Sequence, residues 1–106
     1  MGKKEEITSI IQSSSTTLTA EVGKYYRFDV PVGTLTITLP TMTDTTTVKT
    51  IVFYLTAGST PAVTFTSTHS IYYADGFEIK SGKTYEVNAA WNGLAWIVAS
   101  ITIIVE

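Results

Sequence analysis

Hydrophobic and polar residues alternate along most of this chain, a pattern that predicts β-strands rather than helices. The clearest case is residues 34–39 (TLTITL), in which three aliphatic side chains are separated by threonines. Successive side chains of a strand point to opposite faces of its sheet, so this segment has one apolar and one polar face. Residues 51–55 (IVFYL) are apolar throughout, which indicates a strand buried on both faces.

Turn-forming residues interrupt this pattern about every 8 to 12 residues, as is typical of antiparallel sandwiches and small barrels. The strongest signal is Asn92-Gly93, because both residues tolerate the positive φ angles of a type I′ hairpin turn. A two-residue turn there places Trp91 opposite Leu94. Because no long helical pattern intervenes, we predict an all-β fold, an antiparallel, jelly-roll-like β-sandwich of about eight or nine strands closed by this C-terminal hairpin.

The last strand of the hairpin is apolar on both faces. Leu94, Trp96 and Val98 alternate and are predicted to face the core. The remaining positions form a second apolar row: Ala95, Ile97, Ala99, Ile101, Ile103 and Val105. A sandwich strand with one face in solvent should not carry such a row. Because burying apolar surface stabilises a protein by about 25 cal/mol per Å², we expect the row to be covered.

The sequence leaves two kinds of cover open. A second copy of the chain could pack against the row, which makes four residues a candidate interface of a homo-oligomer: Ile97, Ile101, Ile103 and Val105. Alternatively, the beginning of the same chain could lie there through Ile7, Ile10 and Ile11. We favour the oligomer, because leaving the Ile and Val side chains of the row in water is costly enough to favour assembly.

A chain of 106 residues suits one hydrophobic core. We divide it into an N-terminal arm, residues 1–12, and a single β-sandwich domain, residues 13–106. In the arm, Ile7, Ile10 and Ile11 fit either a short helix or the start of a strand, and they are candidate residues for attaching the chain to a larger assembly. No apolar run approaches the roughly 20 residues of a membrane-spanning helix, so no membrane insertion is expected.

The composition narrows the range of partners. Only 15% of the residues are charged and the formal net charge is -2, which provides no long-range attraction for phosphate backbones. We therefore expect no nucleic-acid partner. The chain contains no cysteine, so it has neither disulfides nor thiolate metal sites, in keeping with folding in a reducing compartment.

No catalytic or cofactor-binding motif is visible. His69 is the only histidine, and a lone histidine between strands is ordinarily an exposed loop residue rather than a ligand or general base. Asp75 and Glu78 are close in sequence, but Asp75 is better explained by the preference of Asp-Gly for tight turns than by a calcium site. We predict that the protein is not an enzyme and needs no metal or cofactor; a hydrolase is the only activity worth assaying.

Aromatic residues suggest one binding chemistry, because stacked aromatic faces suit the apolar faces of sugars. Tyr72 and Tyr73 precede the Asp75-Gly76 turn, and together with Asp75 they are candidate glycan contacts. Trp91 and Trp96 are instead predicted to pack in the core, since they fall on the inner face of the hairpin. A carbohydrate-binding module is therefore the alternative function.

The segment from Tyr25 to Ser100 resembles a β-rich module that recurs in structural proteins of tailed bacteriophages, namely head-fibre, decoration and tail-fibre proteins. Its most specific parts are Gly76-Phe77-Glu78-Ile79, Gly82-Lys83-Thr84-Tyr85-Glu86-Val87-Asn88, and Trp91-Asn92-Gly93 followed by Trp96. The resemblance covers about three quarters of the chain, and the motifs are structural ones.

This resemblance implies a non-enzymatic virion component that is made in the host cytoplasm and exposed on the particle surface. Proteins of this kind are commonly trimers that attach through a short N-terminal segment. The resemblance therefore implies three kinds of partner: further copies of the chain in a homotrimer, the major capsid or tail protein of the virion, and a cell-surface glycan. Because the arm is short for a coiled-coil stalk, a compact surface protein is favoured over a long fibre.

Overall fold

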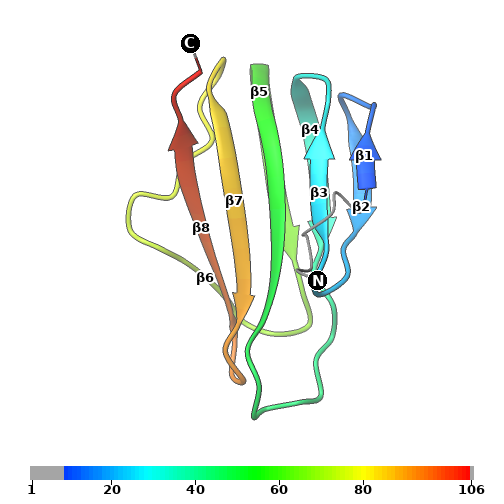
Figure 1. Cartoon of the computed structure of the whole chain (residues 1–106), viewed down its shortest axis with the longest axis vertical. Helices are drawn as coiled ribbons and strands as arrows, with labels where there is room; N and C mark the ends of the chain where they lie inside the picture. The colour runs from blue at the N-terminus through cyan, green and yellow to red at the C-terminus, as the bar shows by residue number, and fades with distance from the viewer. Residues whose placement is uncertain (1–8, 106) are drawn as a thin grey trace, which may run out of the picture.

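A computed structural model describes residues 9–105 of the chain, and it is built of strands and loops (Figure 1). The strands are β1 (Ser9–Ile11), β2 (Thr16–Thr19), β3 (Tyr25–Phe28), β4 (Val32–Thr38), β5 (Lys49–Thr66), β6 (Ile71–Tyr73), β7 (Thr84–Trp91) and β8 (Trp96–Ile103). Within this range there is no helix, which confirms the all-β prediction. No helix able to cross a membrane is present among these residues.

All eight strands belong to one mixed sheet in the order β1-β3-β5-β7-β8-β6, with β4 also joined to β5 and β2 joined to β4. Among the described residues only the β5–β7 and β7–β8 pairs are antiparallel. The other five pairs are parallel. The antiparallel part of the sequence prediction is therefore wrong for most of the sheet, and the jelly-roll-like sandwich is not confirmed.

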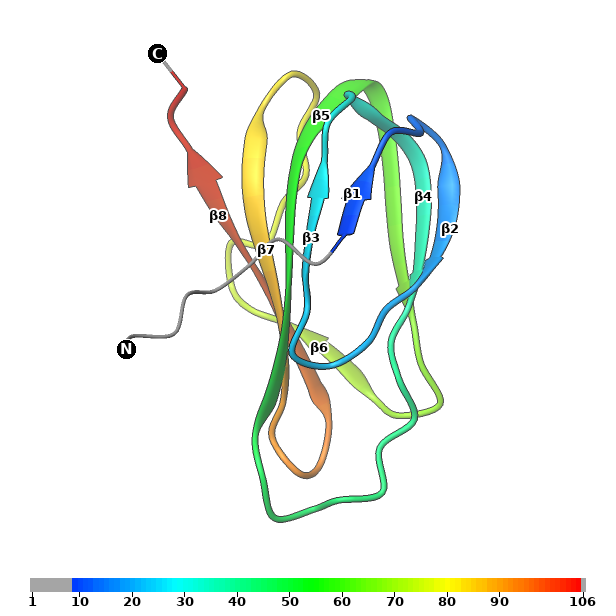
Figure 2. The ribbon, with the colours of Figure 1, turned by 45° about the vertical axis from the view of Figure 1, so that its right-hand side comes forward.

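Strand β5 explains this topology. It is 18 residues long, and its first part pairs with β3 and β7 whereas its second part pairs with β4. Figure 2 shows β5 rising, turning over and descending, so that the sheet doubles back on itself. The successive strands β1–β2 and β3–β4 make the same turn, and the three arches stack in parallel.

Parallel neighbours are usually linked through a helix, but here β1 is linked to its neighbour β3 through an arch and strand β2. The connections are residues 12–15 and 29–31, and β5 makes its own bend without a break. Gly58 lies at that bend, where a Cβ atom would sit 3.0 Å from the carbonyl oxygen of Val32 in β4. Glycine therefore lets the two arches approach each other more closely than a residue with a side chain would.

The core lies inside the doubled sheet. Phe53, from the first part of β5, stacks on Tyr26 with ring centroids 5.6 Å apart and meets Phe65, from the second part, edge to face at 5.8 Å. All three rings are buried. Because two residues of the same strand meet across the core, burial of these rings holds the bend of β5 in place.

The C-terminal hairpin is present, but its turn differs from the prediction. Trp91 pairs with Trp96 rather than with Leu94, because the Asn92 side chain accepts hydrogen bonds from the backbone N–H groups of Leu94 and Ala95, both at 2.9 Å. The loop is therefore four residues long. Leu94 is 83% exposed instead of lying in the core, and Ala95 is buried instead of pointing outward.

Replacing Phe53 by alanine should lower the free energy of unfolding by about 3–5 kcal/mol, because the ring is fully buried between Tyr26 and Phe65. Urea denaturation followed by circular dichroism measures this loss. Thr64→Ser, an exposed change on the same strand, is the matched control and should shift the midpoint little. Equal stabilities for the two variants would contradict the central position of Phe53.

Candidate functional site

The outer face of β8 carries apolar side chains that are not part of the buried core. We define the outer row as Ile97, Ala99, Ile101 and Ile103, whose side chains alternate with the buried Trp96 and Val98. Ile101 is 56% exposed, and Val105, just past the end of the strand, is 68% exposed. The prediction that this strand is apolar on both faces is confirmed.

The described part of the N-terminal arm does not cover the outer row. Strand β1, which contains Ile10 and Ile11, pairs with β3 and is separated from β8 by β3, β5 and β7. Ile11 packs against the core, and Ile10 is 48% exposed at the far side of the sheet. Ile7 lies outside the described residues. The alternative in which Ile10 and Ile11 shelter the row is therefore wrong.

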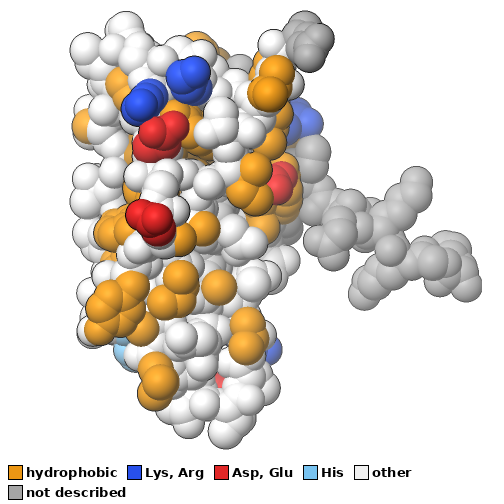
Figure 3. All heavy atoms as spheres, turned by 90° about the vertical axis from the view of Figure 1, so that its left-hand side faces the viewer, with side chains coloured by type: hydrophobic (Ala, Val, Ile, Leu, Met, Phe, Trp, Pro, Cys, Tyr) orange, Lys and Arg blue, Asp and Glu red, His pale blue; other side chains and the backbone are white. Residues whose placement is uncertain are grey.

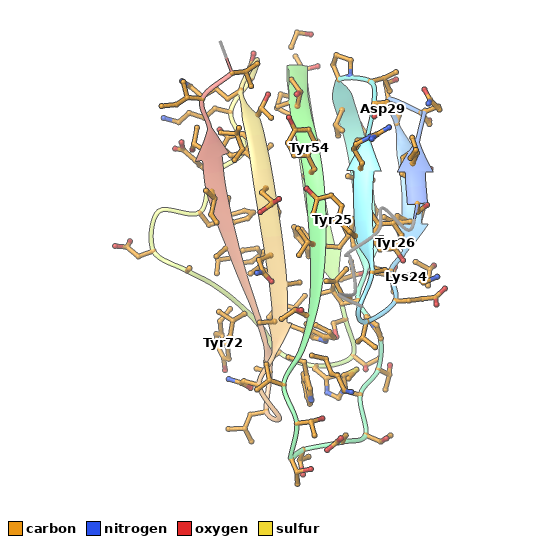
Figure 4. The ribbon with its side chains drawn as sticks, viewed as in Figure 1. Lys24, Tyr25, Tyr26, Asp29, Tyr54 and Tyr72 are labelled. Atoms are coloured by element: carbon orange, nitrogen blue, oxygen red, sulfur yellow. The ribbon has the colours of Figure 1, made fainter. Side chains whose placement is uncertain are left out.

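Polar groups on the same face of the sheet are largely paired with one another. The Tyr25 hydroxyl donates to Glu86 Oε2 at 2.8 Å, and burial together with this carboxylate raises the pKa of Tyr25 to about 12. Arg27 binds Asp29 through two nitrogens, Nε at 2.6 Å and Nη2 at 3.0 Å. Tyr25 and Tyr54 lie along β3 and β5 in Figure 4. This face therefore offers apolar surface rather than free charge.

At the other end of the molecule, the loop after β4 is fastened to the hairpin. Trp91 Nε1 donates to the carbonyl oxygen of Asp44 at 2.7 Å, and Trp96 Nε1 donates to that of Pro40 at 3.3 Å. A Cβ atom on Gly93 would lie only 2.5 Å from the carbonyl oxygen of Thr45. Both tryptophans are buried, as predicted, and each indole N–H has a partner in the loop.

His69 also contacts both the loop after β4 and the hairpin. Its Nε2 accepts a hydrogen bond from the backbone N–H of Met42 at 2.8 Å, and its ring lies 4.6 Å from that of Trp91. The residue is partly buried, so the expectation of an exposed loop histidine is wrong. Sequence could not indicate this, because residue 42 is far from residue 69 along the chain. His69 supports the loop, and its Nε2 is already engaged.

The carboxylate of Asp44 organises the tip of this loop. It accepts hydrogen bonds from the backbone N–H and hydroxyl of Thr46, each at 2.8 Å, and from the hydroxyl of Thr47 at 2.7 Å. These bonds, with Lys49 nearby, lower the pKa of Asp44 to about 2. The sequence alone shows Asp44 as an isolated charge in a threonine-rich segment and does not indicate these hydrogen bonds.

The candidate glycan residues do not form one platform. Tyr72 is 59% exposed and lies beside Ile97 on the outer face, as Figure 4 shows for its ring near the lower end of β8. Tyr73 points to the opposite side, where its ring is 4.8 Å from that of Phe77. Asp75 is exposed in the following turn, where Gly76 has a φ of 84°. Of the three residues, only Tyr72 offers an aromatic ring next to the outer row.

Threonine side chains make the surface of β2, β4 and β5 polar although the chain has few charged residues. In the parallel strands β2, β4 and β5 they are in register, which produces two ladders: Thr17, Thr36 and Thr64, and Thr19, Thr38 and Thr66. The hydroxyls of Thr38 and Thr66 are 3.2 Å apart. This surface is polar without charge, and the branched side chains suit a pleated sheet.

Within residues 9–105 there is no group of His, Cys, Asp or Glu side chains arranged to hold a metal ion. Comparison with protein-family models, with curated proteins and with solved structures finds no match to this chain. The candidate site is therefore the outer row of β8, identified by its own chemistry.

Asp44 should make stability depend on pH in acid. Its folded-state pKa of about 2 is below the usual 3.8, so its contribution is present at pH values above 3.8 and is lost as the pH falls toward 2. The melting temperature of the wild type should therefore fall more steeply than that of Asp44→Asn over this range. The pKa of Asp29 is also lowered. Because Asp29 is present in both proteins, its effect on the melting temperature cancels when the two curves are compared. Parallel curves would mean that the carboxylate does not support the loop.

Single substitutions should separate the two tyrosines of β6. Tyr73→Ala should destabilise the chain, because it removes a ring that packs on Phe77, whereas Tyr72→Ala should leave the unfolding midpoint nearly unchanged. If the chain binds a glycan on an array, Tyr72→Ala should weaken that signal. A signal lost only in Tyr73→Ala would place the sugar on the opposite side of β6.

Proposed function

We propose that this chain is a non-enzymatic structural component of a tailed-bacteriophage virion, displayed on the capsid or tail surface and self-associating through β8. The observation that carries the proposal is the outer row of β8, which is partly or largely exposed among the described residues, on a strand whose Trp96 and Val98 are already buried on the other face. A soluble monomer has little reason to keep such a row, because exposed contiguous apolar surface favours association.

The residues that carry the phage resemblance have structural roles that suit this proposal. Gly76, Gly82 and Gly93 adopt positive φ angles in turns. Trp91 and Trp96 fasten the loop after β4, and the Tyr85 hydroxyl accepts a hydrogen bond from the backbone N–H of Lys80 at 2.8 Å. Such motifs define a rigid module rather than a catalytic centre. A doubled sheet with a threonine-rich surface suits a particle that leaves the cell.

Attachment to the major capsid or tail protein is assigned to the N-terminal arm. Within its described part, Ile11 is engaged with the core, so Ile10 is the isoleucine that remains available to a partner. Strand β1 is also the last strand on its side of the sheet, which leaves one side of its backbone open to another chain. Glycan adhesion at Tyr72 is compatible with this placement.

The virion role is tested on particles. An antibody raised against the chain should label purified virions of the phage that encodes it at a regular position on the capsid or tail in electron microscopy. Self-association is tested on the purified chain with Ile101→Lys, which should reduce the mass measured by light scattering toward 11.5 kDa, because a charge then lies in the outer row.

Leu94→Lys is the matched control, since Leu94 is an exposed apolar residue at the hairpin tip and away from the outer row. It should keep the wild-type mass. Purified virions without the protein would contradict the virion role. An unchanged mass for Ile101→Lys would remove the outer row from the interface.

A further inference from the structure

Strand β8 is paired along its whole length on one side only. Strand β7 pairs with residues 96–103, but β6 pairs with Trp96, Ile97 and Val98 and then leaves the sheet. Figure 1 shows the upper part of β8 as the outermost strand of the sheet. Beyond Val98 no strand among the described residues pairs with this side of β8, which we call its open edge, although the backbone N–H of Glu78 donates to Ser100 Oγ at 3.0 Å.

The backbone groups at this edge can be identified. Trp96 donates its N–H to Ser70, and Val98 accepts from Ala74 with its carbonyl, so even-numbered residues of β8 direct their backbone groups toward the β6 side. By the alternation of a strand, the N–H and C=O groups of Ser100 and Thr102 face the same side. No strand pairs with them there among residues 9–105.

This edge lacks the features that normally prevent strand addition. Residues 96–105 contain no proline and no charged residue. By contrast, the second part of β5 carries Pro61 on its unpaired side, where it cannot donate a hydrogen bond. Figure 3 faces the β8 edge and shows hydrophobic side chains over its height, with charged ones mostly in its upper half. The nearby Glu78 and Lys80 are paired with each other at 3.3 Å.

Exposed apolar residues and a hollow accompany the open edge. Ile101, Ile104 and Val105 are all more than half exposed. A hollow of about 250 Å³ lies beside them, between residues 82–84 and 102–105. An added strand at this edge would thus find backbone partners beside exposed aliphatic side chains.

We infer that the open edge of β8 pairs antiparallel with the same edge of a second copy of the chain, about a two-fold axis at Thr102. The inference rests on the self-association proposed above and specifies its geometry. The two Thr102 residues exchange backbone hydrogen bonds, and Ser100 of each copy pairs with Ile104 of the other. The two sheets become one continuous sheet, and the outer rows of both copies adjoin.

A second copy fits this edge better than an unrelated strand, because the pairing is self-complementary. Antiparallel addition about Thr102 places Ile101 against Ile103 and Thr102 against its own copy, and residues 96–105 bring no charge to the pairing. It yields a dimer, in contrast to the trimer expected from the phage resemblance. The mass of the assembly, twice or three times 11.5 kDa, distinguishes the two.

Thr102→Cys tests the axis directly, because the chain has no other cysteine. The two Cα atoms of a hydrogen-bonded antiparallel pair are about 5.5 Å apart, within the range of a disulfide. Mild oxidation should therefore convert Thr102→Cys to a covalent dimer several times faster than Leu94→Cys, which is exposed elsewhere.

Thr102→Pro tests the backbone contact. It removes an N–H that faces the open edge and leaves the ladder with β7 intact, so circular dichroism should be unchanged while the dimer dissociation constant rises roughly tenfold or more. Thr102→Val keeps the N–H and should dimerise like the wild type.

The outcomes separate this inference from the proposed function. If the wild type associates and Ile101→Lys does not, but Thr102→Cys crosslinks no faster than Leu94→Cys, the edge pairing is wrong and self-association stands. A wild type that is monomeric at all concentrations overturns both modes of association, and virion labelling then decides the virion role alone.

Discussion

The contact between Phe53 and Phe65 is the constraint on which the rest of the structure depends. Both residues belong to β5, and their meeting across the core requires the strand to fold back on itself. Once β5 is bent, its first part offers edges to β3 and β7 and its second part an edge to β4. The N-terminal arches and the C-terminal hairpin are therefore organised by a single strand, and their cores are continuous.

The hairpin contributes a second constraint at the opposite end. The indoles of Trp91 and Trp96 bind carbonyl groups of the loop after β4, and His69 binds the same loop from another direction. The polar groups of these side chains thus form hydrogen bonds with the backbone of the loop, which is not part of a strand. This explains why a loop of ten residues between β4 and β5 can be held against the core.

The alternation of apolar and polar residues predicts where strands lie, but it does not predict which strands pair with each other. Alternation in residues 34–39 and the doubly apolar last strand correctly indicated β4 and β8 with its outer row. The parallel arches were missed because helix-free connections leave no periodic signal, and because Pro61, a residue typical of turns, lies inside β5. The hairpin register was missed because the Asn92 side chain, rather than its backbone conformation alone, decides the turn. His69 and Asp44 could not be placed, since their partners depend on tertiary structure.

The position of β7 in the sheet has a consequence for the order of assembly. β7 closes the side of β5 that β3 leaves open, yet it is synthesised after all three arches. On the ribosome, the first part of β5 therefore remains half-paired until residues up to Trp91 have emerged. The pairs that β7 makes with β5 and β8 must wait for that moment, whereas the three arches can pair with one another earlier. The C-terminal hairpin is therefore expected to join the sheet last.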